Sequence, residues 1–250
     1  MDITPRPLFD APPPANAALF LDFDGTLVDI ADTPDGIHVP AALGGLLDDL
    51  RAATNGAMAL VTGRSIRDIE RHLPGAVPWI AGCHGGERRT PQGHWAHPLT
   101  GDGRVRALQR EVKALRGFRQ GVITEEKPLG AVVHYRRTPD LEPALHRAAQ
   151  AIATAYPGFE CHPAKMAFEL RPADMGKAHV LRAWMQEPPF KGRVPVFLGD
   201  DLTDEPALAW VRDAGGTAIK VGDGDSVAPH RLTTPDAVRD ALAAWHAQSS

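Results

Sequence analysis

Two groups of aspartates in this sequence have the type and spacing needed to act on a phosphate or to hold a metal ion. They are Asp22 and Asp24, at the end of an apolar run at residues 17–23, and Asp200 and Asp201, after a second apolar run at residues 194–198. A single aspartate after a strand is usually a turn former. Several carboxylates at neighbouring strand ends repel one another unless a cation neutralises them. Because Mg²⁺ takes oxygen ligands, the spacing predicts a magnesium site.

The segments around these aspartates alternate between predicted strands and helices. Strands are predicted at residues 17–23, 57–61, 77–81, 194–198 and 217–221, and helices at residues 40–55, 65–72, 175–186, 207–214 and 235–246. The strands are short and apolar, which is typical of strands buried on both faces of a parallel sheet. The helices carry apolar residues at helical spacing, and Ser65 is placed to cap the second one. The pattern predicts a doubly wound, Rossmann-like α/β sheet, whose strand carboxyl ends form a ligand crevice.

The middle of the chain has a different pattern. Helices are predicted at residues 105–115 and 141–156, and strands at residues 130–136 and 166–171. The last strand alternates apolar and polar residues, so one face of its sheet is expected to be solvated. We therefore predict a small α+β unit inserted into the core. The predicted divisions are a loose N-terminal tail at 1–15, a core at 16–99 and 173–250, and a cap at 100–172.

The composition excludes several classes of protein. The chain has 250 residues, with 27 Lys and Arg against 31 Asp and Glu and a net charge of −4, so no nucleic-acid partner is expected. No apolar run approaches the roughly 20 residues of a membrane span, so no membrane partner is expected. Two cysteines, Cys83 and Cys161, are too few for a disulfide framework, and the first residues lack the apolar stretch of a signal peptide. We therefore expect a cytoplasmic protein and favour a monomer.

Four motifs, in order along the chain, resemble those of the haloacid-dehalogenase-like (HAD) phosphatase superfamily. They are Asp22-Phe23-Asp24-Gly25-Thr26, Thr62 within Val61-Thr62-Gly63-Arg64, Lys177 on a predicted helix, and Gly199-Asp200-Asp201-Leu202-Thr203-Asp204. A cap inserted after the third core strand also matches one layout of this superfamily. The resemblance implies a HAD-like doubly wound core with an inserted α+β cap. It also implies an enzyme, a phosphoric monoester hydrolase.

The resemblance further implies a role for each residue of these motifs. Asp22 is the nucleophile that attacks phosphorus and forms an aspartyl-phosphate, and Asp24 is the general acid and base. Thr62 and Lys177 bind the transferring phosphoryl group and offset its charge. The implied Mg²⁺ ligands are Asp22, the backbone carbonyl of Asp24, and Asp200. Asp201 and Asp204 are expected to orient waters on the metal or to orient Lys177. The phosphate is expected to be held by Asp22, Gly25, Thr62, Gly63 and Lys177.

Within the superfamily, the chain resembles the bacterial trehalose-6-phosphate phosphatases over about residues 17–245. The segments that carry this resemblance are LFLDFDGTLVDI (19–30), ALVTGRS (59–65), AGCHGGERR (81–89), EEKPLGAVVHYR (125–136), AFELRP (167–172) and PVFLGDDLTDE (195–205). Two positions depart from the family pattern, Pro128 and Ala178, where glycine is common. The resemblance implies a Mg²⁺-dependent hydrolysis of trehalose 6-phosphate to trehalose and phosphate, the last step of trehalose biosynthesis.

A disaccharide substrate needs charged groups that form hydrogen bonds with neighbouring hydroxyls. Glu125 and Lys127 are two residues apart, so an extended backbone points both side chains the same way. Glu169 stands between Phe168 and Leu170, which places its carboxylate on the exposed face of the predicted sheet. The resemblance assigns sugar binding to Glu125, Lys127 and Glu169, with Arg136 and Glu87 as weaker candidates. Glu87 is expected in a turn near the hinge between core and cap.

Other interpretations stay open at this point. A related phosphatase for sucrose phosphate or a hexose phosphate has the same core motifs and differs only in its cap. A two-metal phosphodiesterase or polymerase also uses paired aspartates, but the net charge of −4 and the DxDGT spacing argue against it. A non-catalytic sugar-phosphate-binding protein is expected to lack Asp22 or Asp24, and both are present. No catalytic role is assigned to His84 or His134, and residues 222–225 are interpreted as a turn.

Overall fold

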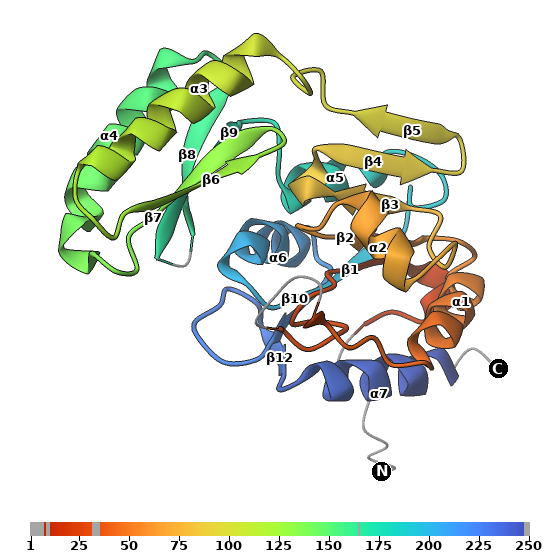
Figure 1. Cartoon of the computed structure of the whole chain (residues 1–250). Helices are drawn as coiled ribbons and strands as arrows, with labels where there is room; N and C mark the ends of the chain where they lie inside the picture. The colour runs from red at the N-terminus through yellow and green to blue at the C-terminus, as the bar shows by residue number, and fades with distance from the viewer. Residues whose placement is uncertain (1–7, 9–10, 32–35, 165, 248–250) are drawn as a thin grey trace. The chain divides into compact units, whose positions relative to one another are not determined.

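Figure 1 shows the computed structural model of the chain, which describes residue 8 and residues 11–31, 36–164 and 166–247. The chain divides into two compact units. The first, called the core unit below, contains Met1–Trp95 and Gly176–Ser250, and the second, called the inserted unit, contains Ala96–Met175. The divisions fall at 95/96 and 175/176, where the sequence predicted 99/100 and 172/173.

The core unit is built on an eight-stranded sheet with the order β12-β11-β10-β1-β2-β3-β4-β5. The strands are β1 (Ala17–Leu21), β2 (Met58–Val61), β3 (Ile80–Gly82), β4 (Glu87–Thr90), β5 (Gly93–Ala96), β10 (Val194–Gly199), β11 (Thr217–Val221) and β12 (His230–Leu232). Neighbouring strands from β12 to β3 are parallel, and β4 pairs with β3 in the antiparallel direction. Because β1 and β10 are parallel neighbours, the aspartate motifs that follow them lie at the same edge of the sheet.

Helices cover both faces of this sheet. They are α1 (Leu43–Ala53), α2 (Ile66–His72), α5 (Lys177–Trp184), α6 (Glu205–Asp213) and α7 (Pro235–His246), seen around the sheet in Figure 1. Alternate side chains of β1 face two different apolar clusters. Leu19 packs in the cluster that contains Leu47 of α1 and Leu242 of α7, whereas Phe20 packs with Trp184 of α5. The predicted doubly wound α/β core is therefore confirmed.

Local signals in the sequence account for several element boundaries. Helix α2 begins after Ser65, whose hydroxyl accepts a hydrogen bond from the backbone N–H of Asp68 at 3.1 Å. Helix α7 begins at Pro235, and Thr234 caps it in the same way. The third core strand starts at residue 80, three residues later than predicted, and strands β4, β5 and β12 were not predicted.

The inserted unit is an α+β layer of two helices on a four-stranded antiparallel sheet with the order β6-β7-β9-β8. Its elements are α3 (Gly103–Ala114), β6 (Ile123–Lys127), β7 (Gly130–His134), α4 (Glu142–Ala155), β8 (Phe159–Ala164) and β9 (Ala167–Pro172). Side chains from one sheet face, including Val133 and Leu170, pack with Leu108 of α3 and Leu145 of α4. Strands β6 and β8 were not predicted. The opposite face carries the polar side chains of β9, as the alternation in residues 166–171 predicted, but it is not openly solvated, because Glu169 and Arg171 are each only 13% exposed.

Short 3₁₀ helices complete the described structure: Pro14–Asn16, Cys83–Gly85, Leu115–Gly117, Pro139–Leu141 and Leu202–Asp204. The described part of the N-terminal segment is not a loose tail as expected. Trp245 donates a hydrogen bond from its indole Nε1 to the carbonyl of Pro12 at 3.0 Å, and Arg193 donates to the carbonyl of Ala15 at 2.6 Å. Residues 1–7 and 9–10 of the predicted tail lie outside the described residues. None of the helices in the described part of the chain combines the length and apolarity of a membrane crossing.

Candidate active site

The first aspartate motif turns sharply at the carboxyl end of β1. Asp22 donates its backbone N–H to the carbonyl of Leu198 in β10 at 3.0 Å, so the two strands remain paired up to the motif. Gly25 has a φ of +70°, and a Cβ at this position would lie 2.1 Å from Oδ2 of Asp200. Only glycine combines this backbone conformation with such a close approach. The turn therefore brings Asp22 and Asp200 to one place.

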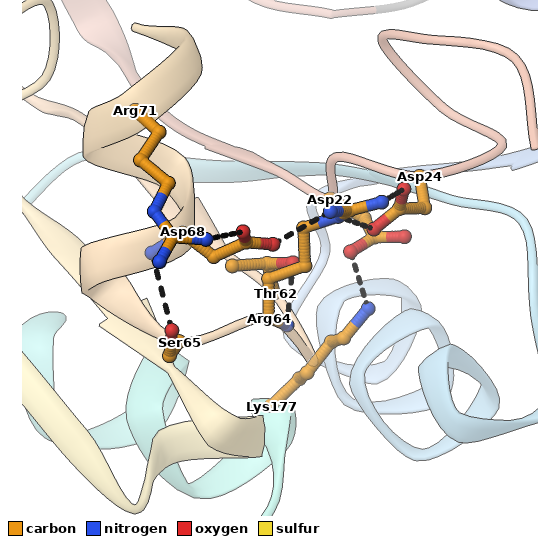
Figure 2. A network of polar contacts seen from close by, with 8 residues as sticks. All are labelled: Asp22, Asp24, Thr62, Arg64, Ser65, Asp68, Arg71 and Lys177. Atoms are coloured by element: carbon orange, nitrogen blue, oxygen red, sulfur yellow. Dashed lines mark hydrogen bonds and ion pairs between the residues drawn. The ribbon is translucent and has the colours of Figure 1, made fainter. Parts of the chain in front are cut away.

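Lys177 reaches this place from the first residue of α5. Its side chain is 3% exposed, and its Nζ lies 2.6 Å from Oδ1 of Asp22 and 2.5 Å from Oδ1 of Asp204. Burial alone would lower the pKa of Lys177, but the charges of Asp204 and Asp22 outweigh it and hold the pKa above its ordinary value. Lys177 is therefore a fixed cation at the centre of the acidic group, as Figure 2 shows for its contact with Asp22.

Asp204 organises the loop that follows β10. Its Oδ2 accepts hydrogen bonds from the backbone N–H groups of Asp200 and Asp201, both at 3.1 Å, and its side chain is fully buried. Gly199 permits this, because a Cβ there would lie 2.6 Å from Cγ of Asp204. Asp201 is exposed, and its carboxylate accepts a hydrogen bond from the N–H of Leu202 at 2.6 Å. Asp204 thus holds Lys177 and the loop, whereas Asp201 caps the short helix that follows.

Three carboxylates meet closely enough to surround one ion. Ligand atoms of Asp22, Asp200 and Asp204 all lie within 4.8 Å of one another. Burial, followed by the nearby charge of Asp204, raises the pKa of Asp200 to about 6, and burial also raises the pKa of Asp22. Such a group is stable only when positive charge offsets it. The Asp204 carboxylate is already engaged by the ion pair of its Oδ1 with Lys177 and by two backbone N–H groups at its Oδ2, so Asp22 and Asp200 are the carboxylates that fit a hard divalent cation.

The second motif lies at the end of β2, next to β1. Thr62 is fully buried, and its Oγ1 accepts a hydrogen bond from the backbone N–H of Arg64 at 3.1 Å. Because this bond uses only an acceptor lone pair of the hydroxyl, its proton remains available for donation to another group. At Gly63 a Cβ would lie 2.7 Å from the Cε1 atom of His84. Glycine at this position therefore leaves room for the His84 ring.

Two cationic residues of the site were missed by sequence reasoning. Arg64 forms two hydrogen bonds with the Asp24 carboxylate, from Nε at 2.7 Å and from Nη2 at 2.8 Å. Lys220, a buried residue of β11, donates a hydrogen bond from Nζ to the backbone carbonyl of Asp200. Two features of the sequence could have identified them. Arg64 is an arginine two positions after Thr62, and Lys220 is a lysine inside the apolar strand TAIKV.

In the inserted unit, three of the predicted sugar-binding residues, Glu125, Lys127 and Glu169, share the polar face of the sheet. Glu125 is opposite Val132 on β7, and Val132 is opposite Glu169 on β9, so the two glutamates lie in one row. The Nζ of Lys127 lies 2.5 Å from Oε1 of Glu125, which confirms that the two side chains point the same way. Burial would raise the pKa of Glu125, but Lys127 and His134 outweigh it and lower the pKa.

Three details of this group differ from expectation. The Glu169 side chain is 13% exposed rather than open, and burial raises its pKa against the charge of Arg171, whose Nε is 3.4 Å away. Arg136 was predicted inside a strand, but β7 ends at His134 and Arg136 lies exposed in the turn that follows. Glu87 was predicted in a turn, but it begins β4, and its Oε1 accepts a hydrogen bond from the N–H of Ile66 at 2.6 Å. The Glu87 carboxylate is therefore engaged within the core unit.

Comparisons with known proteins identify the family to which the chain is similar. A family model described as trehalose-phosphatase matches residues 20–235. A Sinorhizobium fredii protein named "Probable trehalose-phosphate phosphatase" is 39% identical over 208 residues, 83% of this chain and 78% of that protein. The Escherichia coli trehalose-6-phosphate phosphatase is 38% identical over 234 residues, 92% of this chain and 88% of that protein.

Solved structures agree as well. The trehalose-6-phosphate phosphatase of Aspergillus fumigatus superposes with a TM-score of 0.73 at 22% identity, covering 93% of this chain and 93% of that chain. At this identity the likeness concerns the fold, and the predicted HAD-like fold class is confirmed. The extent of the family match and the identity to the bacterial relatives settle the membership. This chain belongs to the trehalose-phosphatase family, a family of phosphoric monoester hydrolases.

Proposed function

We propose that this enzyme hydrolyses trehalose 6-phosphate to trehalose and phosphate, with Mg²⁺ as its cofactor and Asp22 as its nucleophile. The observation that carries the proposal is the buried Asp22 carboxylate, held by Lys177 beside Asp200 at the end of two parallel strands. A carboxylate in this position is fixed in place and its negative charge is offset, as attack on an anionic ester requires. The names of the two bacterial relatives support the choice of substrate.

In the first step, an oxygen of Asp22 forms a bond to phosphorus while the bond from phosphorus to the sugar oxygen breaks. Lys177 offsets the charge of the transferring group, and the Thr62 hydroxyl donates a hydrogen bond to one of its oxygens. Asp24 gives its proton to the departing sugar oxygen. When bound by Asp22, Asp200 and the Asp24 carbonyl, Mg²⁺ supplies Lewis-acid stabilisation of the phosphoryl oxygens.

In the second step, a water molecule attacks the phosphorus of the aspartyl-phosphate. Asp24, now a carboxylate, takes a proton from the attacking water, and the bond between phosphorus and the Asp22 oxygen breaks. Phosphate leaves, Asp22 is again a carboxylate, and Asp24 is again protonated. Asp204 takes no part in bond changes in this scheme, and it keeps Lys177 and the Asp200 loop in place.

The inserted unit offers the groups suited to a disaccharide. Glu125 and Glu169 provide acceptors in one row of the polar sheet face, and Lys127 provides a donor beside them. We propose that these three residues bind the hydroxyls of the sugar. Arg136, exposed next to β7, is a further candidate in this unit, whereas Glu87 already serves the start of α2.

A substrate panel tests this proposal. We expect kcat/KM for trehalose 6-phosphate to exceed that for sucrose 6-phosphate and glucose 6-phosphate by on the order of 100-fold, because unmatched polar groups in a sugar site are costly. Removal of Mg²⁺ by a chelator is expected to abolish turnover of every substrate. Glu125→Gln should lower the preference for trehalose 6-phosphate over the other two substrates. Glu126→Gln, at the next residue of β6, which is also exposed, is the matched control. Equal kcat/KM values across the panel would instead indicate a phosphatase of broader specificity.

A further inference from the structure

The proposed general acid and base, Asp24, is held by an arginine from the neighbouring strand end. Both Asp24 oxygens accept hydrogen bonds from Arg64, Oδ2 from Nε at 2.7 Å and Oδ1 from Nη2 at 2.8 Å. The Asp24 side chain is 34% exposed and the Arg64 side chain is 10% exposed. A paired contact of this kind fixes the plane of the carboxylate as well as its position, while the exposed part remains open to a reactant.

Arg64 is itself anchored on a rigid element, as Figure 2 shows. Its Nη1 donates a hydrogen bond to Oδ2 of Asp68, on the first turn of α2, at 2.6 Å. The backbone N–H of Asp68 is in turn bound by the Ser65 hydroxyl that caps the helix. Three nitrogens of the guanidinium therefore have carboxylate partners on two sides, and the group has little freedom to rotate.

We propose that Arg64, anchored by Asp68, is a positioning residue that sets the orientation of Asp24 for its proton transfers. This inference rests on the proposed function, since it assigns a use to the Asp24 role described there. An unrestrained aspartate carboxylate rotates broadly about χ2, so only part of its conformations aim an oxygen at the reacting group. The two parallel hydrogen bonds from Arg64 restrict this rotation. Because this paired contact needs a planar group with parallel donors, lysine is not equivalent to arginine here.

The two proton transfers by Asp24 differ in how much they need this orientation. In the first step, the Asp24 proton goes to the departing oxygen as the phosphorus–oxygen bond breaks. The rate of this step depends strongly on that proton when a sugar alkoxide leaves, and little when a nitrophenolate leaves. In the second step, a water proton goes to Asp24 as the water oxygen bonds to phosphorus and the Asp22 oxygen is released. This second transfer is the same for every substrate. Loss of the orientation should therefore slow both steps with a sugar phosphate, and only the second with 4-nitrophenyl phosphate.

The test uses Arg64→Gln, Arg64→Lys and Asp68→Asn, with Arg71→Gln as the control. Arg71 lies 3.6 Å from the other oxygen of Asp68 and is exposed, so its loss should change no rate. With trehalose 6-phosphate, the kcat of Arg64→Gln is expected to be about 100-fold lower than that of wild type. The KM is expected to change by less than about threefold. Arg64→Lys should recover only part of the loss, and Asp68→Asn should lose about tenfold, because Arg64 then keeps Asp24 but not its anchor.

Rapid mixing with 4-nitrophenyl phosphate separates positioning from a general structural effect. Arg64→Gln is expected to release one nitrophenolate per site at a rate within about threefold of wild type, followed by a steady state slowed about 100-fold. A burst slowed as much as the steady state, or unchanged rates in all three variants, would overturn the inference. Asp68→Asn and Arg64→Lys keep the test valid if Arg64→Gln does not fold. Failure of wild type to hydrolyse trehalose 6-phosphate would refute the proposed substrate, while the nitrophenyl measurement would still test Arg64.

Discussion

Replacing Asp200 by asparagine is expected to make the metal-free protein more stable at neutral pH. Asp200 lies among Asp22, Asp204 and Lys177, and burial with the charge of Asp204 raises its pKa to about 6. Its ordinary pKa is about 3.9, so the shift is roughly two units and corresponds to about 3 kcal/mol. The ionised form is therefore less favourable in the folded chain than in the unfolded chain. Asparagine fills the same space and carries no charge.

The direction of the pH dependence follows from this shift. The folded state binds the Asp200 proton more tightly than the unfolded state does, so protonation contributes stability that is fully present below about pH 4. That contribution is lost as the pH rises through about 6. At pH 7 without metal, wild type is therefore expected to be less stable than Asp200→Asn by up to about 3 kcal/mol, and at pH 4 the two should be nearly equal.

The assay is urea unfolding in a chelator at the two pH values, with thermal unfolding as a second measure. For a chain of this size, 3 kcal/mol corresponds to a melting temperature roughly 6–12 °C higher. Asp201→Asn is the matched control, because Asp201 is exposed and asparagine caps a helix as well as aspartate does. Added Mg²⁺ should stabilise wild type and the control but not Asp200→Asn. Equal or lower stability of Asp200→Asn at pH 7 in chelator would refute the reasoning.

Three further substitutions test other parts of the account. Gly25→Ala is expected to lower kcat about 100-fold, because the added Cβ would displace Asp200, whereas Gly44→Ala, which has open space around it, should leave kcat unchanged. Glu169→Gln should reduce kcat/KM for trehalose 6-phosphate about tenfold more than for 4-nitrophenyl phosphate, and equal losses would argue against sugar binding. Lys220→Met should weaken Mg²⁺ binding in calorimetry by about tenfold, because the Asp200 carbonyl loses its donor. An unchanged Mg²⁺ affinity would contradict that role for Lys220.

The sequence was sufficient to predict those parts of the fold whose burial produces apolar runs. Strands β1 and β2 are buried at every position, so their runs stand out and both strands could be located, although the predicted strand at residues 17–23 extends two residues beyond β1. Strands β4 and β5 contain no fully buried residue, and their sequences ERRT and GHWA have no apolar pattern. These two strands are extended because they pair with neighbouring strands, and the local residue pattern does not reveal this pairing.

The same distinction applies to the site. Asp22 and Asp200 were predictable together because both follow buried parallel strands, and such strand ends meet at one edge of a sheet. The contact between Arg64 and Asp24 spans 40 residues and depends on how two loops turn, which spacing alone does not reveal. The burial of Glu169 likewise depends on neighbouring side chains such as Arg171 rather than on its own strand pattern.

The central claim is that Asp22 takes the phosphoryl group from trehalose 6-phosphate. The most direct test mixes the enzyme with this substrate and Mg²⁺, quenches in acid over a series of short times, and locates covalent phosphate by peptide mass spectrometry. We expect one phosphoryl group on Asp22 that forms before free phosphate appears and is absent from Asp22→Asn. Turnover of the substrate with no phosphoryl group on Asp22 at any time, or near-normal phosphate release by Asp22→Asn, would contradict it.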